Sequence, residues 1–210
     1  MSERSTQTES NLDRLQPETA EHRKADYPVD PLFLNRWSPR SFERREVTDE
    51  TLHTILEAAR WSPSANNRQQ WRFIVAKTEE QRALFHTFLN PGNLAWAQYA
   101  PVLIVLASAR LDEKGEPNGP NAFDTGAAWS HLALQATLLG LHAHAMGGFQ
   151  REEARRALAV PDSYDLHVVI ALGYRGPREA LPEALQEREK PNGRRPLAES
   201  IVLGRFPDAP

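Results

Sequence analysis

Residues 62–76 read SPSANNRQQWRFIVA, a loop of serine, asparagine and glutamine side chains that runs directly into an apolar segment. Aromatic and β-branched residues dominate 71–76, which predicts a strand. Thr48 can cap a helix that precedes the loop. The apolar positions of this helix keep helical spacing, at Leu52, Ile55, Leu56 and Ala59. The stretch therefore predicts a loop of polar side chains that joins a helix to a strand.

The segments that follow continue this alternation of helices and strands. Thr78 with Gln81 forms a capping box for a further helix. The continuous apolar run 101–108 predicts a strand that is buried on both faces. A solvated loop is expected at 109–121, a central buried helix at 124–141, a surface helix at 151–158 and a strand at 167–174. Together these elements predict an α+β fold, with a mixed central sheet flanked by helices.

Both ends of the chain differ from the middle. Residues 1–30 are polar and charged without a convincing apolar stripe, and we expect a flexible or loosely docked N-terminal arm there. The domain then spans 31–210. After Arg175 the apolar signal stops, and a tail rich in Pro, Glu and Arg follows. A tail with so little core of its own must pack on something else, and a partner subunit is a natural candidate.

Composition excludes several classes of protein. The chain has 210 residues, a formal net charge of -3 and no cysteine, so it has no disulfides, thiolate nucleophiles or cysteine-ligated metals. The sequence lacks the clustered excess of Lys and Arg that a nucleic-acid-binding surface requires. The longest apolar run is too short to span a bilayer, and no signal peptide is visible at the N-terminus. We expect a soluble cytoplasmic protein with neither nucleic-acid nor membrane partners.

The segment RWSPRSF, residues 36–42, has the strongest potential for ligand binding. In an extended segment, side chains at alternate positions share one face, so Arg36, Ser38 and Arg40 would converge on one ligand. Guanidinium groups bind phosphate bidentately, and the serine hydroxyl adds a donor. The same residues are also compatible with a solvated basic turn.

Three further segments carry candidate ligand-binding groups. Ser64, Asn67 and Gln69 can pair with the edge of a polar heterocycle, or can form an ordinary turn. Gly147 and Gly148 allow a backbone to approach a ligand closely, or simply form a turn. Near the C-terminus, residues 194–197 (RRPL) are a second basic site or a charged tail.

The order and spacing of these segments resemble the nitroreductase family of flavoproteins, from about Arg36 to Leu203. The segments that carry the resemblance are RWSPRSF, SPSANNRQQW, the helical DTGAAWSHLALQATLLGL, GGF and RRPL. The resemblance implies a homodimer with FMN at the subunit interface and the C-terminal tail wrapped around the partner. It also implies an NAD(P)H-dependent oxidoreductase in which hydride passes through N5 of FMN to an electron-poor acceptor, such as a nitroaromatic, a quinone or an enone, in a ping-pong cycle.

The resemblance assigns roles residue by residue. Arg36 and Ser38 would hold the FMN phosphate, with Arg194 or Arg195 arriving from the tail. Arg40 would lie near N1 and the C2 carbonyl of the ring. A backbone N–H of Gly147 or Gly148 would face N5. The flavin or its ribityl chain would be contacted, typically from the other subunit, by Pro63, Ser64, Asn67 and Gln69. No side chain need act as a catalytic nucleophile, and no metal is implied.

Two departures from the family pattern stand out. Gln70 replaces the proline that follows the glutamine, which could loosen that loop. His142 and His144 stand where small residues are commoner; two alternating histidines are weak evidence for a metal site, and packing on a strand explains them as well. We further expect that 109–121 and 90–99, with Phe88 and Trp96 nearby, shape the acceptor pocket.

Other functions fit the same sequence. Relatives with this fold use the flavin for dehalogenation, flavin cleavage or azoline oxidation. A second alternative is a non-catalytic FMN-binding redox sensor, and a third is a globular domain without flavin whose arginines are merely at the surface. The spectrum of the purified protein, with and without nicotinamide, separates these classes.

Overall fold

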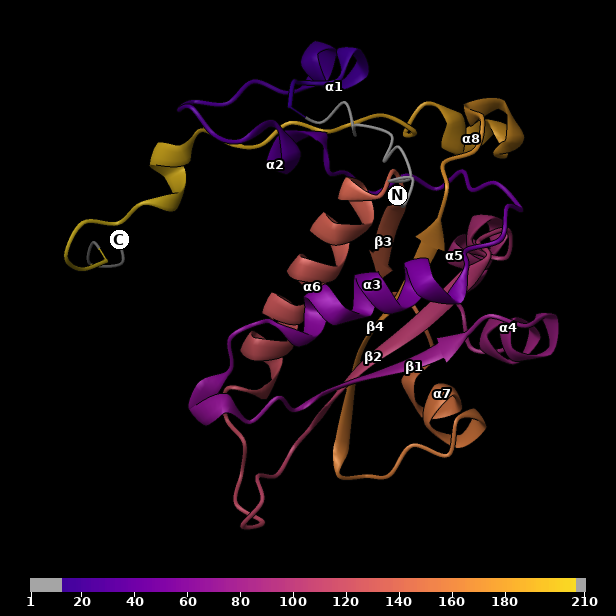
Figure 1. Cartoon of the computed structure of the whole chain (residues 1–210), viewed down its shortest axis with the longest axis vertical. Coiled ribbons are helices and arrows are strands. Elements are labelled where there is room, and N and C mark those ends of the chain that lie inside the picture. The colour runs from indigo at the N-terminus through magenta and orange to yellow at the C-terminus, as the bar shows by residue number, and fades with distance from the viewer. Residues whose placement is uncertain (1–12, 207–210) are drawn as a thin grey trace, which may run out of the picture.

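The computed structural model describes residues 13–206. A four-stranded sheet lies at the centre, with helices on both of its faces (Figure 1). Its strands are β1 (Trp71–Ala76), β2 (Val102–Ala109), β3 (His142–Met146) and β4 (Tyr164–Gly173). The α-helices are α1 (Pro17–His22), α2 (Pro31–Asn35), α3 (Asp49–Arg60), α4 (Glu79–His86), α5 (Pro91–Ala97), α6 (Asn121–Leu138), α7 (Arg151–Ala157) and α8 (Glu183–Gln186). Short 3₁₀ turns are η1 (Ala65–Asn67), η2 (Arg178–Ala180) and η3 (Leu197–Ser200).

The strands lie in the order β1-β2-β4-β3, and every neighbouring pair is antiparallel. The expectation of a mixed sheet is therefore wrong for the part of the chain that the structure describes, whereas the α+β class is confirmed. The continuous apolar run of β2 is buried on both faces, as expected. This burial comes from helices that cover both faces of an antiparallel sheet.

Two apolar cores lie on opposite faces of the sheet. Successive residues of β2 alternate between them, as the pleat of a strand requires. Leu103 and Val105 pack into the core that includes residues of α4, α5 and α7. Ile104 and Leu106 face the core beneath α3 and α6. The long helices α3 and α6 lie side by side on that second face (Figure 1).

The central helix begins and ends three residues earlier than expected. Gly140 adopts φ +74°, a left-handed conformation that ends a helix, so Leu141 packs in the core after the turn. The helix is also not buried all round. Ala128, Leu132 and Ala136 face the core, whereas the opposite side, which includes Phe123, Gly126 and Ser130, is exposed.

The described N-terminal segment contacts the segment that follows α8. Residues 13–30 of the expected arm are docked, because Thr19 of α1 is buried and Glu18 pairs with Arg175. Arg23 also bonds to the main chain of Asn192, at 2.8 Å. Residues 1–12, the remainder of that arm, lie outside the described residues. The C-terminal segment with η3 extends away from the sheet (Figure 1).

None of the helices between residues 13 and 206 combines the length and the apolar character that a bilayer crossing requires.

Candidate functional site

A strongly basic pocket of about 490 Å³ lies where the 36–40 segment meets β3 and the segment after α8. The 36–40 segment contributes Arg36, Ser38 and Arg40, and β3 contributes His144. Six lining side chains are cationic and one is acidic: Arg23, Arg36, Arg40, Arg188, Lys190, Arg194 and Glu187. Three of the predicted cofactor-binding residues, Arg36, Ser38 and Arg40, thus share one cavity with Arg194.

The cations of this pocket repel one another. Burial, together with the charges of Arg194 and Arg36, lowers the pKa of Arg23 to about 10. Burial, followed by the charge of Arg194, likewise lowers the pKa of Arg36. Among the described residues, no ion pair involves Arg36, Arg40 or Arg194. Like charges held together at partly buried positions are stabilised by an anion, so the pocket is suited to a phosphate.

Hydrogen bonds hold the main chain of the 36–40 segment in place. Arg23 donates to the carbonyl oxygen of Arg36 at 2.8 Å, and Nδ1 of His144 lies 2.9 Å from that of Pro39. The ring of His144 also packs on Trp96, with 4.6 Å between ring centroids. His144 is therefore a packing residue that braces the loop.

A buried carboxylate fixes the next part of the same segment. Glu189 is 2 % exposed, and its oxygens accept the backbone N–H groups of Arg40 and Ser41. The Ser41 hydroxyl donates to the carbonyl of Pro177 at 2.6 Å. Sequence reasoning missed Glu189, because it stands in a run of charged residues where no spacing singles it out.

Close backbone packing secures the far end of the segment. The Gly176 N–H donates to the carbonyl of Ser41 at 3.0 Å. A Cβ at Gly176 would come within 2.9 Å of the Ser41 hydroxyl and 3.0 Å of the Phe42 main chain. Only glycine permits this approach, so the end of β4 and the basic segment are held in register.

The loop that carries Pro63, Ser64, Asn67 and Gln69 is anchored to the first turns of α6. Asp124 is buried and accepts the Ala65 N–H at 2.9 Å. It also accepts the side-chain amide of Gln70 at 2.6 Å. Gln70, which replaces the family proline, is thus bonded rather than loose. The role of Asp124 was not predicted.

Backbone strain in this loop indicates a preformed shape. Asn66, Asn67 and Gln69 all have positive φ, between 50° and 56°. Residues other than glycine adopt this conformation at a cost, which the surrounding bonds must offset. The Ser64 hydroxyl accepts the Gln69 N–H at 3.1 Å, and the Gln69 amide donates to Asn67 at 3.0 Å. These side chains shape the loop itself.

Gly147 and Gly148 follow β3 and lie against the turn that opens α5. The Asn93 side chain donates to the Gly148 carbonyl at 2.8 Å. A Cβ at Gly148 would come within 2.8 Å of that amide, whereas Gly147 has open space beside it. The glycine pair therefore offers an accessible backbone next to a fixed carbonyl.

The predicted site residues do not meet within one chain. The loop 63–69 is tied to Asp124 near the start of α6, whereas β3, which lines the basic pocket, follows the end of α6 (Figure 1). A helix of this length spans about 27 Å at 1.5 Å per residue. Arg194 lines the basic pocket, but Arg195 lines a neighbouring one.

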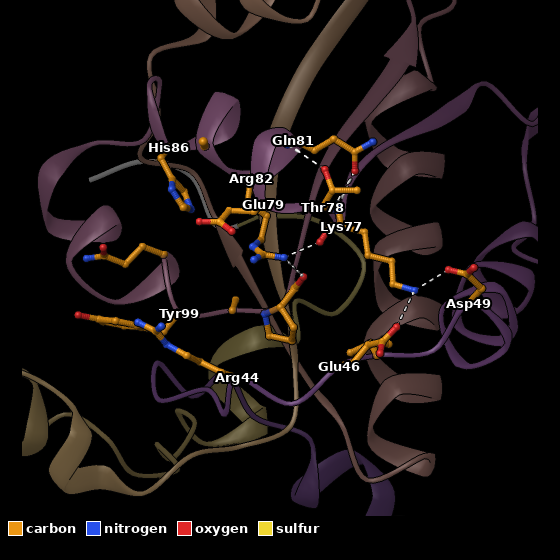
Figure 2. Close-up of a pocket in the computed structure, with 15 residues that line it drawn as sticks. Arg44, Glu46, Asp49, Lys77, Thr78, Glu79, Gln81, Arg82, His86 and Tyr99 are labelled. Carbon is orange, nitrogen blue, oxygen red and sulfur yellow. Dashed lines mark hydrogen bonds and ion pairs between the residues drawn. The ribbon is translucent and has the colours of Figure 1, made fainter.

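A second pocket of about 870 Å³ is larger but less suited to an anion. Figure 2 shows the side chains that line it, and most of its cations already have partners. Lys77 pairs with Glu46 and Asp49, and Arg82 donates to main-chain carbonyls, that of Pro101 among them at 3.2 Å. Arg44 lies over the ring of Tyr99, 5.3 Å from its centroid. The charges of this pocket are largely balanced.

The expected acceptor pocket is not assembled within one chain. Phe88 and Trp96 are 0 % and 1 % exposed and belong to the core, so they line no open cavity. The loop 109–121 lies at the start of α6, away from α5 in Figure 1.

His142, the other histidine of β3, packs edge-on against Trp37, with 6.1 Å between ring centroids.

Comparisons with known proteins identify similar sequences and structures. The Nitroreductase family model matches residues 34–99 and 80–174. A solved structure named as an oxidoreductase containing FMN is 45% identical, with a TM-score of 0.85 over 88% of this chain and 96% of the other.

Two curated relatives are also similar. The NADH dehydrogenase of Thermus thermophilus is 31% identical over 82% of this chain and 93% of its own. A protein of Archaeoglobus fulgidus, provisionally named NADH dehydrogenase/NAD(P)H nitroreductase, is 29% identical over 68% of this chain and 83% of its own. The family match covers more than half of the chain, and so this protein belongs to the nitroreductase family of oxidoreductases.

Proposed function

We propose that the protein binds FMN and uses NAD(P)H to reduce a small electron-poor acceptor, such as a nitroaromatic, a quinone or an enone. The basic pocket carries this proposal, because it gathers guanidinium groups whose mutual repulsion an FMN phosphate would relieve. The FMN named for the 45% identical structure and the nicotinamide-linked names of the relatives support it.

We assign the parts of FMN to residues of the pocket and to the glycines that follow β3. Arg36, Ser38 and Arg194 offer charged and hydroxyl donors for the phosphate. Arg40 follows on the same segment, and we assign it to the N1 and C2 carbonyl edge of the ring, where a cation favours the reduced form. The backbone of Gly147 and Gly148 is assigned to the N5 edge.

The bound FMN would supply hydride transfer at N5, from NAD(P)H to the acceptor, in a ping-pong cycle. The chain's own residues bind and orient the cofactor, set the charge around it and restrict access to it. The arginines supply positive charge around the cofactor, since guanidinium groups remain protonated in proteins.

We further propose that two copies of the chain build each site. The loop of Pro63, Ser64, Asn67 and Gln69 is far from the basic pocket of its own chain, so a second copy would bring it there. The exposed side of α6 includes Phe123, which is 82% exposed. The C-terminal segment exposes Leu203 and Phe206, at 89% and 80%. These apolar surfaces support a homodimer in which the tail packs on the partner.

A paired titration tests the FMN assignment. Arg194→Ala should weaken FMN binding by about tenfold to a hundredfold, because a charge-assisted phosphate contact is lost. Its neighbour Arg195, outside the basic pocket, is the matched control. Riboflavin, which lacks the phosphate, should bind wild type and Arg194→Ala equally. Protein that binds no FMN, or equal losses for FMN and riboflavin, would contradict the assignment.

A further inference from the structure

Glu189 is the one strongly buried residue in a run of exposed charged ones. Its neighbours Arg188 and Lys190 are exposed and line the basic pocket. The Glu189 side chain instead contacts the backbone of Arg40 and Ser41 and is 2 % exposed. Both of its carboxylate oxygens lie 2.9 Å from the Arg40 nitrogen, and one lies 3.0 Å from the Ser41 nitrogen.

These contacts give the carboxylate a defined task. A buried carboxylate is costly unless charged or polar donors satisfy it, and here two consecutive backbone N–H groups do so. The N–H groups of Arg40 and Ser41 both donate to Glu189. These bonds fix the main chain at the point where the Arg40 side chain enters the pocket. Glu189 also provides negative charge that opposes the lowering of the Arg40 pKa by burial and by Arg188.

The carboxylate also joins two segments that are far apart in the sequence. The basic segment begins near residue 36, whereas Glu189 precedes Arg194 by five residues. Both segments line the pocket. One side chain therefore sets the spacing between the two sources of phosphate-binding cations.

We propose that Glu189 is a positioning residue for the cofactor: through the main chain of Arg40 and Ser41 it holds the Arg40 side chain in the orientation that FMN binding requires. This inference rests on the proposed function. Glu189 is buried beside the pocket and acts through the backbone of Arg40 and Ser41.

The test compares FMN affinity in wild type, Glu189→Gln, Glu189→Ala and the control Glu183→Gln. Glu183 is exposed on α8, six residues away. Glutamine keeps the size of the side chain but turns one acceptor into a donor that faces an N–H group. We expect Glu189→Gln to weaken FMN binding by about tenfold. Glu189→Ala should weaken it further, and Glu183→Gln should leave it unchanged.

A double-mutant cycle separates positioning from a general structural role. If Glu189 acts through Arg40, the effect of Glu189→Gln should shrink to within about threefold in an Arg40→Ala background. A general loss of stability would instead give the same effect in both backgrounds. The titrations are made below the melting temperature of every apoprotein, which is measured alongside.

The outcomes are distinct. FMN affinities of Glu189→Gln and Glu189→Ala close to wild type would overturn the inference and leave the proposed function intact. Equal effects with and without Arg40 would also overturn it. Failure of the wild-type protein itself to bind FMN would overturn both the proposed function and the role of Glu189.

Discussion

Two partly buried histidines of β3 lie beside a group of arginines. Burial, followed by the charge of Arg175, lowers the pKa of His142 from 6.5 to about 4. Burial also lowers the pKa of His144 to about 4, with a smaller contribution from the charge of Arg40. Both rings are therefore neutral at working pH and add no charge to the basic pocket.

These pKa values predict a loss of stability in acid. Above pH 6.5 the histidines are neutral in both the folded and the unfolded states. Below pH 6.5 the two histidines bind protons in the unfolded chain but not yet in the folded chain, so the free energy of unfolding falls until about pH 4. The loss is at most about 3 kcal/mol for each histidine. His142→Phe should remove the part of this loss that is due to His142, and urea unfolding at several pH values measures the change.

The control for this change is His53→Phe, at an exposed position of α3. It should leave the acid dependence of the unfolding free energy as it is in wild type. An equally steep loss in His142→Phe, or no loss in wild type between pH 6.5 and pH 4, would refute the role of His142.

Single residues differ in how well their roles can be predicted. The alternation of Arg36, Ser38 and Arg40 predicts that the three side chains lie together, because an extended backbone places alternate side chains on one face, and all three line the basic pocket. The roles of Glu189 and Asp124 could not be predicted, because each side chain accepts backbone N–H groups that are far away in the sequence. No local pattern records such a contact.

At the scale of elements, the loop after α3 depends on one side chain of α6. Asp124→Ala would leave the Ala65 N–H and the Gln70 amide without their acceptor. We expect the free energy of unfolding to fall by about 1–3 kcal/mol, the cost of unsatisfied buried donors. FMN binding should also weaken, because the loop loses its shape. Urea unfolding and FMN titration measure the two effects.

Glu113→Ala, at an exposed position of the loop before α6, is the control for this prediction. Its unfolding free energy should match wild type to within about 0.5 kcal/mol. The account of the loop fails if Asp124→Ala is as stable as the control.

Elements could be predicted better than their arrangement. The strand at 71–76 and the capping box of Thr78 and Gln81 are confirmed, because both are local signals. The end of α6 was placed too late, because apolar residues continue past Gly140. The expectation of a mixed sheet was wrong, because burial on both faces of a strand does not distinguish parallel from antiparallel pairing.

At the scale of the whole molecule, the proposed dimer can be tested through Gly126. This glycine is exposed on α6, and a Cβ there would meet nothing within 4 Å in the single chain. Gly126→Arg should therefore leave the fold intact and yet disrupt a dimer that packs on this face. Sedimentation should show a dimer for wild type and a shift to monomer for the variant, with loss of bound FMN.

Gly92→Arg is the matched control, since Gly92 is also exposed on a helix with free space around it. It should remain dimeric. Wild-type protein that sediments as a monomer, or a dimer untouched by Gly126→Arg, would contradict the proposed interface.

The order of the motifs along the sequence indicates the family but cannot show that one chain holds only separate parts of the site. That separation follows from α6, whose length keeps the loop of Ser64 and Gln69 away from the basic pocket. Only the three-dimensional structure shows this distance, and it is the strongest argument for two copies in one site.

The most direct test of the central claim is the visible absorption spectrum of the protein loaded with FMN, recorded before and after NADPH or NADH is added without oxygen. The account predicts a protein-bound flavin spectrum that bleaches with nicotinamide and returns when an electron-poor acceptor such as a quinone is added. A flavin spectrum that stays oxidised with both nucleotides, or a protein that remains colourless in the presence of FMN, would contradict it.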